Sequence, residues 1–98
     1  MKLERHRSRI DAIDREVVAL LNRRAEIVRE IGAIKAKAAL PVVDRDRETQ
    51  VLESVTSSSE GPLDADALER IYRAVLIECR QIQASIREEH IASGAPQL

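Results

Sequence analysis

A single long apolar stripe without a proline constrains the fold of this 98-residue chain more than any other feature. Its positions are Ile10, Ile13, Val17, Leu20, Arg24, Ile27, Ile31, Ile34 and Ala38, and Val18, Leu21, Ala25 and Val28 widen it. Spacings that alternate between three and four residues are typical of one face of an α-helix. The stripe therefore predicts a helix from about Leu3 to Ala39, which Pro41 ends.

Arg24 lies in the middle of this stripe. A guanidinium keeps its charge and is costly to desolvate unpaired, and no acidic residue stands beside it on the stripe. One interpretation is that the missing anion is a ligand. Two others remain: the side chain lies at the edge of the stripe with its charge in water, or it fixes the register of a helical bundle.

The composition favours an all-α fold with an aliphatic core. Tyr72 is the one aromatic residue, and 16 basic against 17 acidic residues give a net charge of −1. This balance gives no general attraction to nucleic acid or to a membrane. Cys79 is the single cysteine, which excludes an internal disulfide and a cysteine metal site. Because no apolar run is long enough for a signal peptide or a membrane span, we expect a cytoplasmic protein.

Two further helices are predicted in the same single domain, 1–98. Asp44 is expected to cap a short helix that ends near Ser57, and Asp64 a long one that ends near Ile91. The expected inward residues are Val51, Leu52 and Val55 in the short helix, and Leu68, Ile71, Val75, Cys79, Ile82 and Ile86 in the long one. Gly32 is expected to mark close helix packing, and residues 92–98 are expected to fray.

The length of the first helix predicts a homodimer. A helix of about 36 residues is about 54 Å long, and the other two helices cannot cover its apolar stripe within one compact subunit. A second copy of the chain, with the long helices side by side, is the simplest cover.

Polar residues recur beside these apolar faces. Lys35 follows Arg24 by almost a whole number of turns, about 16 Å along the axis, with Ile31 between them. Two cations leaning together across an apolar wall can hold a small dianion.

Other polar groups are less specific. Asp44, Arg47 and Glu48 share a face of the second helix, where the simpler interpretation is a cap and a surface ion pair. Cys79 and Gln83 lie one turn apart on the third helix, and alone they read as a small core residue and an edge amide.

Arg7 lies about 25 Å before Arg24 and a quarter-turn away, so it cannot join Arg24 within one chain. In a dimer, Arg7 of the partner subunit can reach across. The simpler interpretation is that Arg7 belongs to a basic, solvent-exposed end of the first helix.

The ordered motifs resemble those of the helical chorismate mutase family over about residues 3–90. They are Arg7, Ile10-Asp11-Ala12-Ile13-Asp14, Leu20-Leu21-Asn22-Arg23-Arg24, Ile31-Gly32-Ala33-Ile34-Lys35, the run from Pro41 to Glu48, and Cys79 with Gln83. This order is much more specific than any single motif, and it favours a binding role for Arg24.

The resemblance implies an intertwined all-helical homodimer that rearranges chorismate to prephenate, a pericyclic step in phenylalanine and tyrosine biosynthesis, without a cofactor or a metal. Arg24 and Arg7 of the partner subunit would bind the two carboxylates of the substrate. Lys35 and Gln83 would donate to its ether oxygen. Glu48, helped by Asp44, would accept from its ring hydroxyl, and Arg47 and Cys79 would support a carboxylate. Cys79 is a departure, since many relatives have Ser there, and Arg80 replaces an apolar residue of some relatives.

These roles suit a unimolecular rearrangement, which needs a compact substrate conformation and donors at the oxygen where charge develops. Ile31 and Ile82 are expected to form apolar walls.

Three alternatives remain open: an isochorismate–pyruvate lyase, a mutase of the amino analogue of chorismate, and a non-catalytic helical dimerisation module. Because the chain leaves no room for a regulatory domain, feedback control would need a partner protein, such as another enzyme of the pathway.

Overall fold

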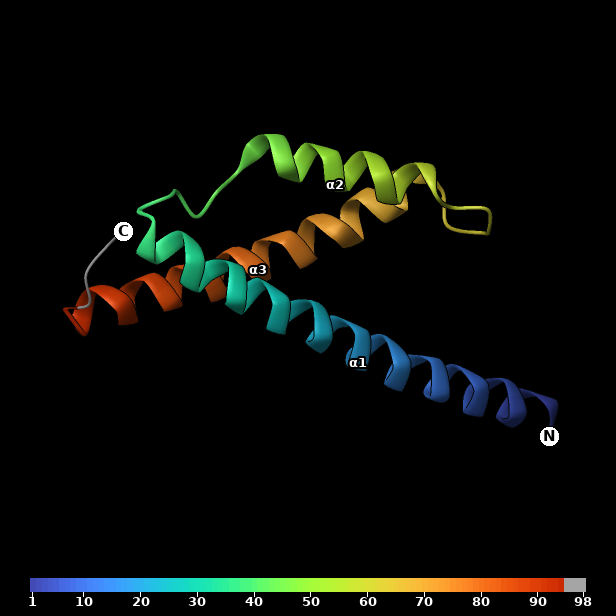
Figure 1. Ribbon diagram of the computed structural model, residues 1–98. Coiled ribbons are helices and arrows are strands. Elements are labelled where there is room, and N and C mark those ends of the chain that lie inside the picture. The colour runs from blue at the N-terminus through green and yellow to red at the C-terminus, as the bar shows by residue number, and fades with distance from the viewer. Residues whose placement is uncertain (95–98) are drawn as a thin grey trace.

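The computed structural model describes residues 1–94, and in that range it contains three α-helices (Figure 1). They are α1 (Lys2–Lys37), α2 (Arg45–Ser57) and α3 (Ala65–Ala92). The predicted order of a long, a short and a long helix is confirmed. None of these helices is long and apolar enough to cross a membrane. The frayed end expected from residue 92 falls mainly on residues outside the described range, and α3 itself continues to Ala92.

The two capping predictions are confirmed. Asp44 precedes α2, and its carboxylate accepts a hydrogen bond from the backbone N–H of Arg47 at 3.0 Å. Asp64 precedes α3 and accepts in the same way from the N–H of Ala67 at 2.8 Å. Each carboxylate satisfies a backbone donor that has no partner within its own helix.

The end of α1 differs from the prediction. The helix stops at Lys37 rather than Ala39, because Ala39 has a left-handed backbone with φ of 57°. The N–H of Leu40 then bonds to the carbonyl of Lys35 at 2.9 Å, and the N–H of Ala39 to that of Ala36 at 3.4 Å. This pair of bonds is a Schellman cap, with alanine where glycine is usual. The chain has thus turned before it reaches Pro41.

Close packing of α1 against α3 depends on small residues of α1. A Cβ atom at Gly32 would lie 3.2 Å from Cδ1 of Ile86 and 3.3 Å from Cγ of Gln83, which is tighter than most side chains tolerate. Gly32 therefore lets the two helices approach, as the sequence predicted. Ala36 is buried one turn later, and Val28 one turn earlier.

The stripe predicted to face inward is exposed in the single chain. Ile27, Ile31 and Ile34 are exposed. The buried residues of α1 are Val28, at the edge of the predicted face, and Gly32 and Ala36, which lie beside it. In α3 the buried residue is Leu76, which the predicted set omits, while Ile71 of that set is exposed. The reason is geometric: α3 is one helix, so it covers one side of α1 and leaves the other side free.

The amino-terminal half of α1 extends away from the other helices (Figure 1). The chain has a radius of gyration of 17.3 Å and extents of 59 × 26 × 14 Å. A compact domain of this length would have a radius of gyration of about 13 Å. Within residues 1–94, Val28, Ala36 and Leu76 are the only buried apolar side chains. The described part of the chain therefore exposes an apolar face that its own helices do not cover.

Candidate active site

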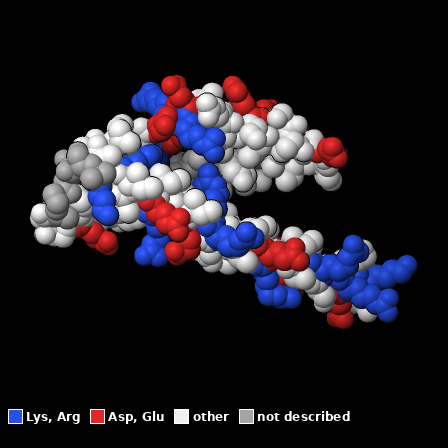
Figure 2. Space-filling view, viewed as in Figure 1, with Lys and Arg blue, Asp and Glu red and all other residues white. Residues whose placement is uncertain are grey.

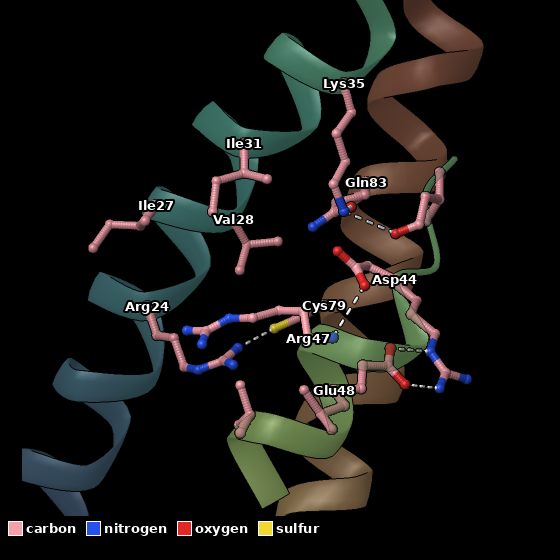
Figure 3. Close-up of a pocket in the computed structure, with 14 residues that line it drawn as sticks. Arg24, Ile27, Val28, Ile31, Lys35, Asp44, Arg47, Glu48, Cys79 and Gln83 are labelled. Atoms are coloured by element: carbon pink, nitrogen blue, oxygen red, sulfur yellow. Dashed lines mark hydrogen bonds and ion pairs between the residues drawn. The ribbon is translucent and has the colours of Figure 1, made fainter. Parts of the chain in front are cut away.

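A pocket of about 400 Å³ forms where the carboxyl-terminal half of α1 meets α2 and α3. Seven of the eight predicted site residues line it: Arg24 and Lys35 from α1, Asp44, Arg47 and Glu48 from the start of α2, and Cys79 and Gln83 from α3. Figure 2 shows basic side chains gathered inside this hollow, and Figure 3 shows the lining in detail. Its volume falls in the range of small-molecule sites. We call it the central pocket.

Lys35 is held at one end of the central pocket by two acceptors. Its ammonium donates to the backbone carbonyl of Val42 at 3.1 Å and to Oε1 of Gln83 at 3.1 Å. An ammonium has three protons, so one donor remains for a ligand. Because the oxygen of the Gln83 amide faces Lys35, the NH₂ group of that amide keeps its donors for the pocket (Figure 3). Two adjacent groups can therefore donate to one ligand atom.

Arg24 lies at the other end and is half-buried. Its Nη1 donates to the sulfur of Cys79 at 2.9 Å, and its guanidinium carbon lies 6.0 Å from the centre of the Tyr72 ring. Within residues 1–94, no carboxylate forms an ion pair with Arg24. A thiol is a weak acceptor and an aromatic ring carries no net charge, so the cation has no anionic partner.

Arg47 adds a second cation beside Arg24. Its side chain extends from α2 into the central pocket towards Arg24 (Figure 3). Asp44, which caps α2 through the N–H of Arg47, also lines the pocket. The cap fixes the first turn of α2, from which Arg47 and Glu48 project.

Glu48 is paired with a residue that the sequence had not assigned to the site. Nε of Arg80 donates to one carboxylate oxygen at 2.7 Å, and Nη2 donates to the other. The hydrogen bonds from Arg80 lower the pKa of Glu48 below its ordinary value; partial burial opposes the shift, and the charges of Arg80, Lys35 and Arg45 add to it. The helical spacing was the available signal, since Arg80 follows Leu76 by four residues and precedes Gln83 by three.

The apolar walls are partly those predicted. Ile31 lines the central pocket, together with Val28, Val51 and Leu76. Ile82 does not line it, so that prediction is wrong. The face of α3 that lines the pocket carries Leu76, Cys79, Arg80 and Gln83, and Ile82 lies outside that face, beyond Cys79 around the helix.

Arg87 on α3 holds the end of α1 in place beside the central pocket. Its Nη2 donates to the carbonyl of Lys35 at 3.2 Å and also to the carbonyl of Leu40. These bonds tie α3 to the end of α1 and to the segment that supplies the Val42 carbonyl. Arg87 could not be predicted from the sequence, because nothing in the pattern of α3 shows which carbonyls of α1 lie opposite it.

Arg7 is the predicted site residue that the chain does not bring to the central pocket. It is exposed in the projecting half of α1. This agrees with the expectation that Arg7 cannot join Arg24 within one chain.

Comparison with known proteins gives consistent matches. The family model described as chorismate mutase type II matches residues 6–84. A bifunctional chorismate mutase/prephenate dehydratase of Aquifex aeolicus is 33% identical over an alignment of 98 residues. The match covers 96% of this chain and 27% of that protein. Its counterpart in Neisseria gonorrhoeae is 37% identical over 78 residues, covering 80% and 21%. The chain thus spans about a quarter of the length of these relatives.

One solved structure matches the fold closely. It is the crystal structure of a chorismate mutase from Helicobacter pylori in complex with prephenate, with a TM-score of 0.81 and 31% sequence identity. The match covers 89% of this chain and 94% of that one.

Proposed function

Because this chain belongs to the chorismate mutase type II family, we propose that it catalyses the rearrangement of chorismate to prephenate. The observation that carries the proposal is the central pocket, which brings together seven of the eight residues that the family resemblance assigns to the site. In this proposal Arg24 forms the anion-binding end of the pocket, and Lys35 and Gln83 form the hydrogen-bond-donating end.

The anion-binding end suits a substrate with carboxylates. Arg24 has no carboxylate partner within residues 1–94, and Arg47 brings a second positive charge near it. A guanidinium binds a carboxylate well because it can donate two parallel hydrogen bonds. The hydrogen bond to Cys79 orients Arg24 before the substrate arrives.

The donating end suits the chemistry of the reaction. As the carbon–oxygen bond stretches, negative charge grows on the ether oxygen. Lys35 and Gln83 hold each other in place and have free donors that can reach this oxygen. Donors fixed in advance stabilise the transition state more than the ground state. Val28, Ile31 and Leu76 shield the site from water and strengthen these interactions.

Glu48 is positioned to accept a hydrogen bond from the ring hydroxyl of the substrate. Its carboxylate lines the central pocket and stays ionised, because Arg80 lowers its pKa. An ionised carboxylate only accepts hydrogen bonds, so it favours a donor at that point of the ligand.

We assign the remaining carboxylate contact to Arg7 of the partner subunit in a homodimer. The exposed apolar stripe on the projecting half of α1 supports this assembly, since Ile10, Ile13, Val17 and Leu20 are all exposed in the single chain. Burying apolar side chains of this size is worth about 1.5–3 kcal/mol each. A partner helix on this stripe would also carry its Arg7 along with it.

The assay that tests the function offers the purified protein chorismate, isochorismate and the amino analogue of chorismate, and identifies the products by NMR. The expected product is prephenate from chorismate. Release of pyruvate from isochorismate at a higher kcat/KM would identify a lyase instead, and preferred turnover of the amino analogue would identify a mutase of that compound. No reaction with any of the three would indicate a non-catalytic dimerisation module.

A further inference from the structure

We propose that Arg80 is a positioning residue through which the central pocket selects a ring hydroxyl over an amino group in its substrate. The inference rests on the proposed function, in which Glu48 accepts a hydrogen bond from that hydroxyl. It concerns a residue outside the set that the family resemblance assigns to the substrate.

The geometry of the pair fixes the direction of the Glu48 carboxylate. Arg80 on α3 donates to both carboxylate oxygens of Glu48 on α2, through Nε and Nη2. Two parallel hydrogen bonds restrict the carboxylate more than one bond would. The side chain of Glu48 is 18% exposed, and Glu48 and Arg80 both line the central pocket. The oxygen lone pairs that Arg80 leaves free are those available to a ligand.

The surroundings of Glu48 are rich in positive charge. The charged residues that line a hollow together with Glu48 come from all three helices. They are Arg24 and Lys35 on α1, Asp44, Arg45 and Arg47 at the start of α2, and Arg73 and Arg80 on α3. Arg80 itself neutralises the charge of Glu48. A ligand group that approaches this carboxylate therefore meets an acceptor whose negative charge is already balanced, in a region that is positive overall.

The neutralised charge of Glu48 makes the site favour a hydroxyl over an amino group at this point of the ligand. A hydroxyl donates a hydrogen bond without bringing a charge, so the positive surroundings do not repel it. An aliphatic amine is protonated at neutral pH and brings a positive charge. Without Arg80, Glu48 would lose the counter-charge that is hydrogen-bonded to it, and its carboxylate would attract that ammonium more strongly. Arg80 is thus the group that keeps Glu48 an acceptor for neutral donors.

Replacement of Arg80 is expected to leave the fold intact. Its side chain is 43% exposed, and exposed ion pairs contribute little to stability. Arg80→Met keeps the aliphatic stem and removes the charge. Arg73→Met is the matched control, because Arg73 lies two turns earlier on α3, lines a hollow with Glu48 and Arg80, and pairs with Glu69 instead.

The kinetic experiment measures kcat/KM for chorismate and for its amino analogue in both variants and in the wild type. Arg80→Met is expected to shift the ratio towards the amino analogue by about tenfold or more, the scale of one nearby charge in a partly exposed site. Arg80→Lys is expected to retain most of the selection, and Arg73→Met to leave the ratio unchanged. An unchanged ratio in Arg80→Met would overturn the proposal.

A second measurement does not depend on turnover. The carboxyl carbon of Glu48 is titrated by ¹³C NMR, with Glu48→Gln to assign its signal. Because Arg80 lowers the pKa of Glu48, Arg80→Met is expected to raise that pKa. A pKa that stays the same in Arg80→Met refutes the positioning role, whatever the substrate is. If the pKa rises while the wild type does not convert chorismate, the pairing stands, and the proposed function and the selection both fail.

Discussion

The two halves of α1 carry the same apolar spacing and have very different surroundings. In the carboxyl-terminal half, α3 buries Val28, Gly32 and Ala36, and the polar side chains beside them line the central pocket. In the amino-terminal half, no helix of the described residues 1–94 covers Ile13, which is 56% exposed, or Val17, which is 46% exposed. One half therefore has its partner helix within the chain, and the other does not.

In the proposed homodimer, this difference gives the two halves of α1 different roles, one in holding the pocket residues and the other in contact with a second chain. The covered half can hold Arg24 and Lys35 in fixed positions because small residues let α3 come close. The uncovered half has no such constraint, and we assign it to a second copy of the chain. Arg7 lies in the uncovered half, so the two tasks meet if the partner's helix delivers it to the central pocket.

The largest effect is expected from Arg24, at the anion-binding end of the covered half. Arg24→Ala should abolish turnover of chorismate and leave the helices folded, because the cation has no anionic partner within residues 1–94. Steady-state kinetics and circular dichroism check the two parts. Arg29→Ala, on an exposed face of the same helix and paired with Glu26, is the control and should keep its activity. A folded Arg24→Ala protein with wild-type activity would contradict the account.

A somewhat smaller loss is expected at the donating end. Lys35→Ala should raise the barrier by about 3 kcal/mol, or lower kcat by about 10²–10³-fold, the usual cost of one donor to a developing negative charge. The loss should appear in kcat more than in KM. Lys37→Ala, two residues later in the last turn of α1, serves as the matched variant. Equal kcat values for the two variants would remove Lys35 from the reaction.

In the uncovered half, charge on the apolar stripe should disrupt assembly. Val17→Asp should convert the protein from twice its chain mass of 11.0 kDa to monomers or loosely associated chains, since a carboxylate is costly to bury unpaired. Analytical ultracentrifugation measures this change. Ser8→Asp adds the same charge off the stripe and should remain dimeric. If Val17→Asp dimerises as tightly as the wild type, this stripe is not the interface.

The smallest effect is expected where α1 ends. Ala39 has a left-handed backbone, which costs an alanine about 1 kcal/mol relative to glycine. Ala39→Gly should therefore stabilise the protein by up to about 1 kcal/mol in urea denaturation, without changing kcat. Ala38→Gly, at the preceding right-handed position, should destabilise it instead. A loss of stability in Ala39→Gly would mean that the Schellman cap does not form.

Much of the fold was predictable because it follows from local chemistry. Helical spacing and two capping aspartates predicted α2 and α3 closely, and the small side chain of Gly32 predicted where α1 and α3 approach. The end of α1 was not predictable, because a left-handed alanine has no marker in the sequence comparable to glycine.

The site was predictable to the extent that helical faces and family motifs identify residues. Those faces indicated that Arg24 and Lys35 lie on one side of α1, and the motifs added the residues of α2 and α3. The contacts of Arg80 and Arg87 were missed, since they join residues far apart in sequence, and only the crossing of the helices decides which atoms meet. The sequence showed the apolar stripe of α1 but not which side of the helix α3 covers, since that side carries Gly32 and Ala36 as well as Val28.

The central claim is that a pocket on the covered half of one α1 is completed by the uncovered half of another. Its most direct test mixes inactive Arg7→Ala chains with inactive Arg24→Ala chains, unfolds them together and refolds them. Half of the dimers should be mixed, and each mixed dimer should contain one intact pocket of two, so about a quarter of wild-type activity is expected to return. Absence of activity, with mixed dimers confirmed by mass spectrometry, would contradict the claim that Arg7 serves the partner's pocket.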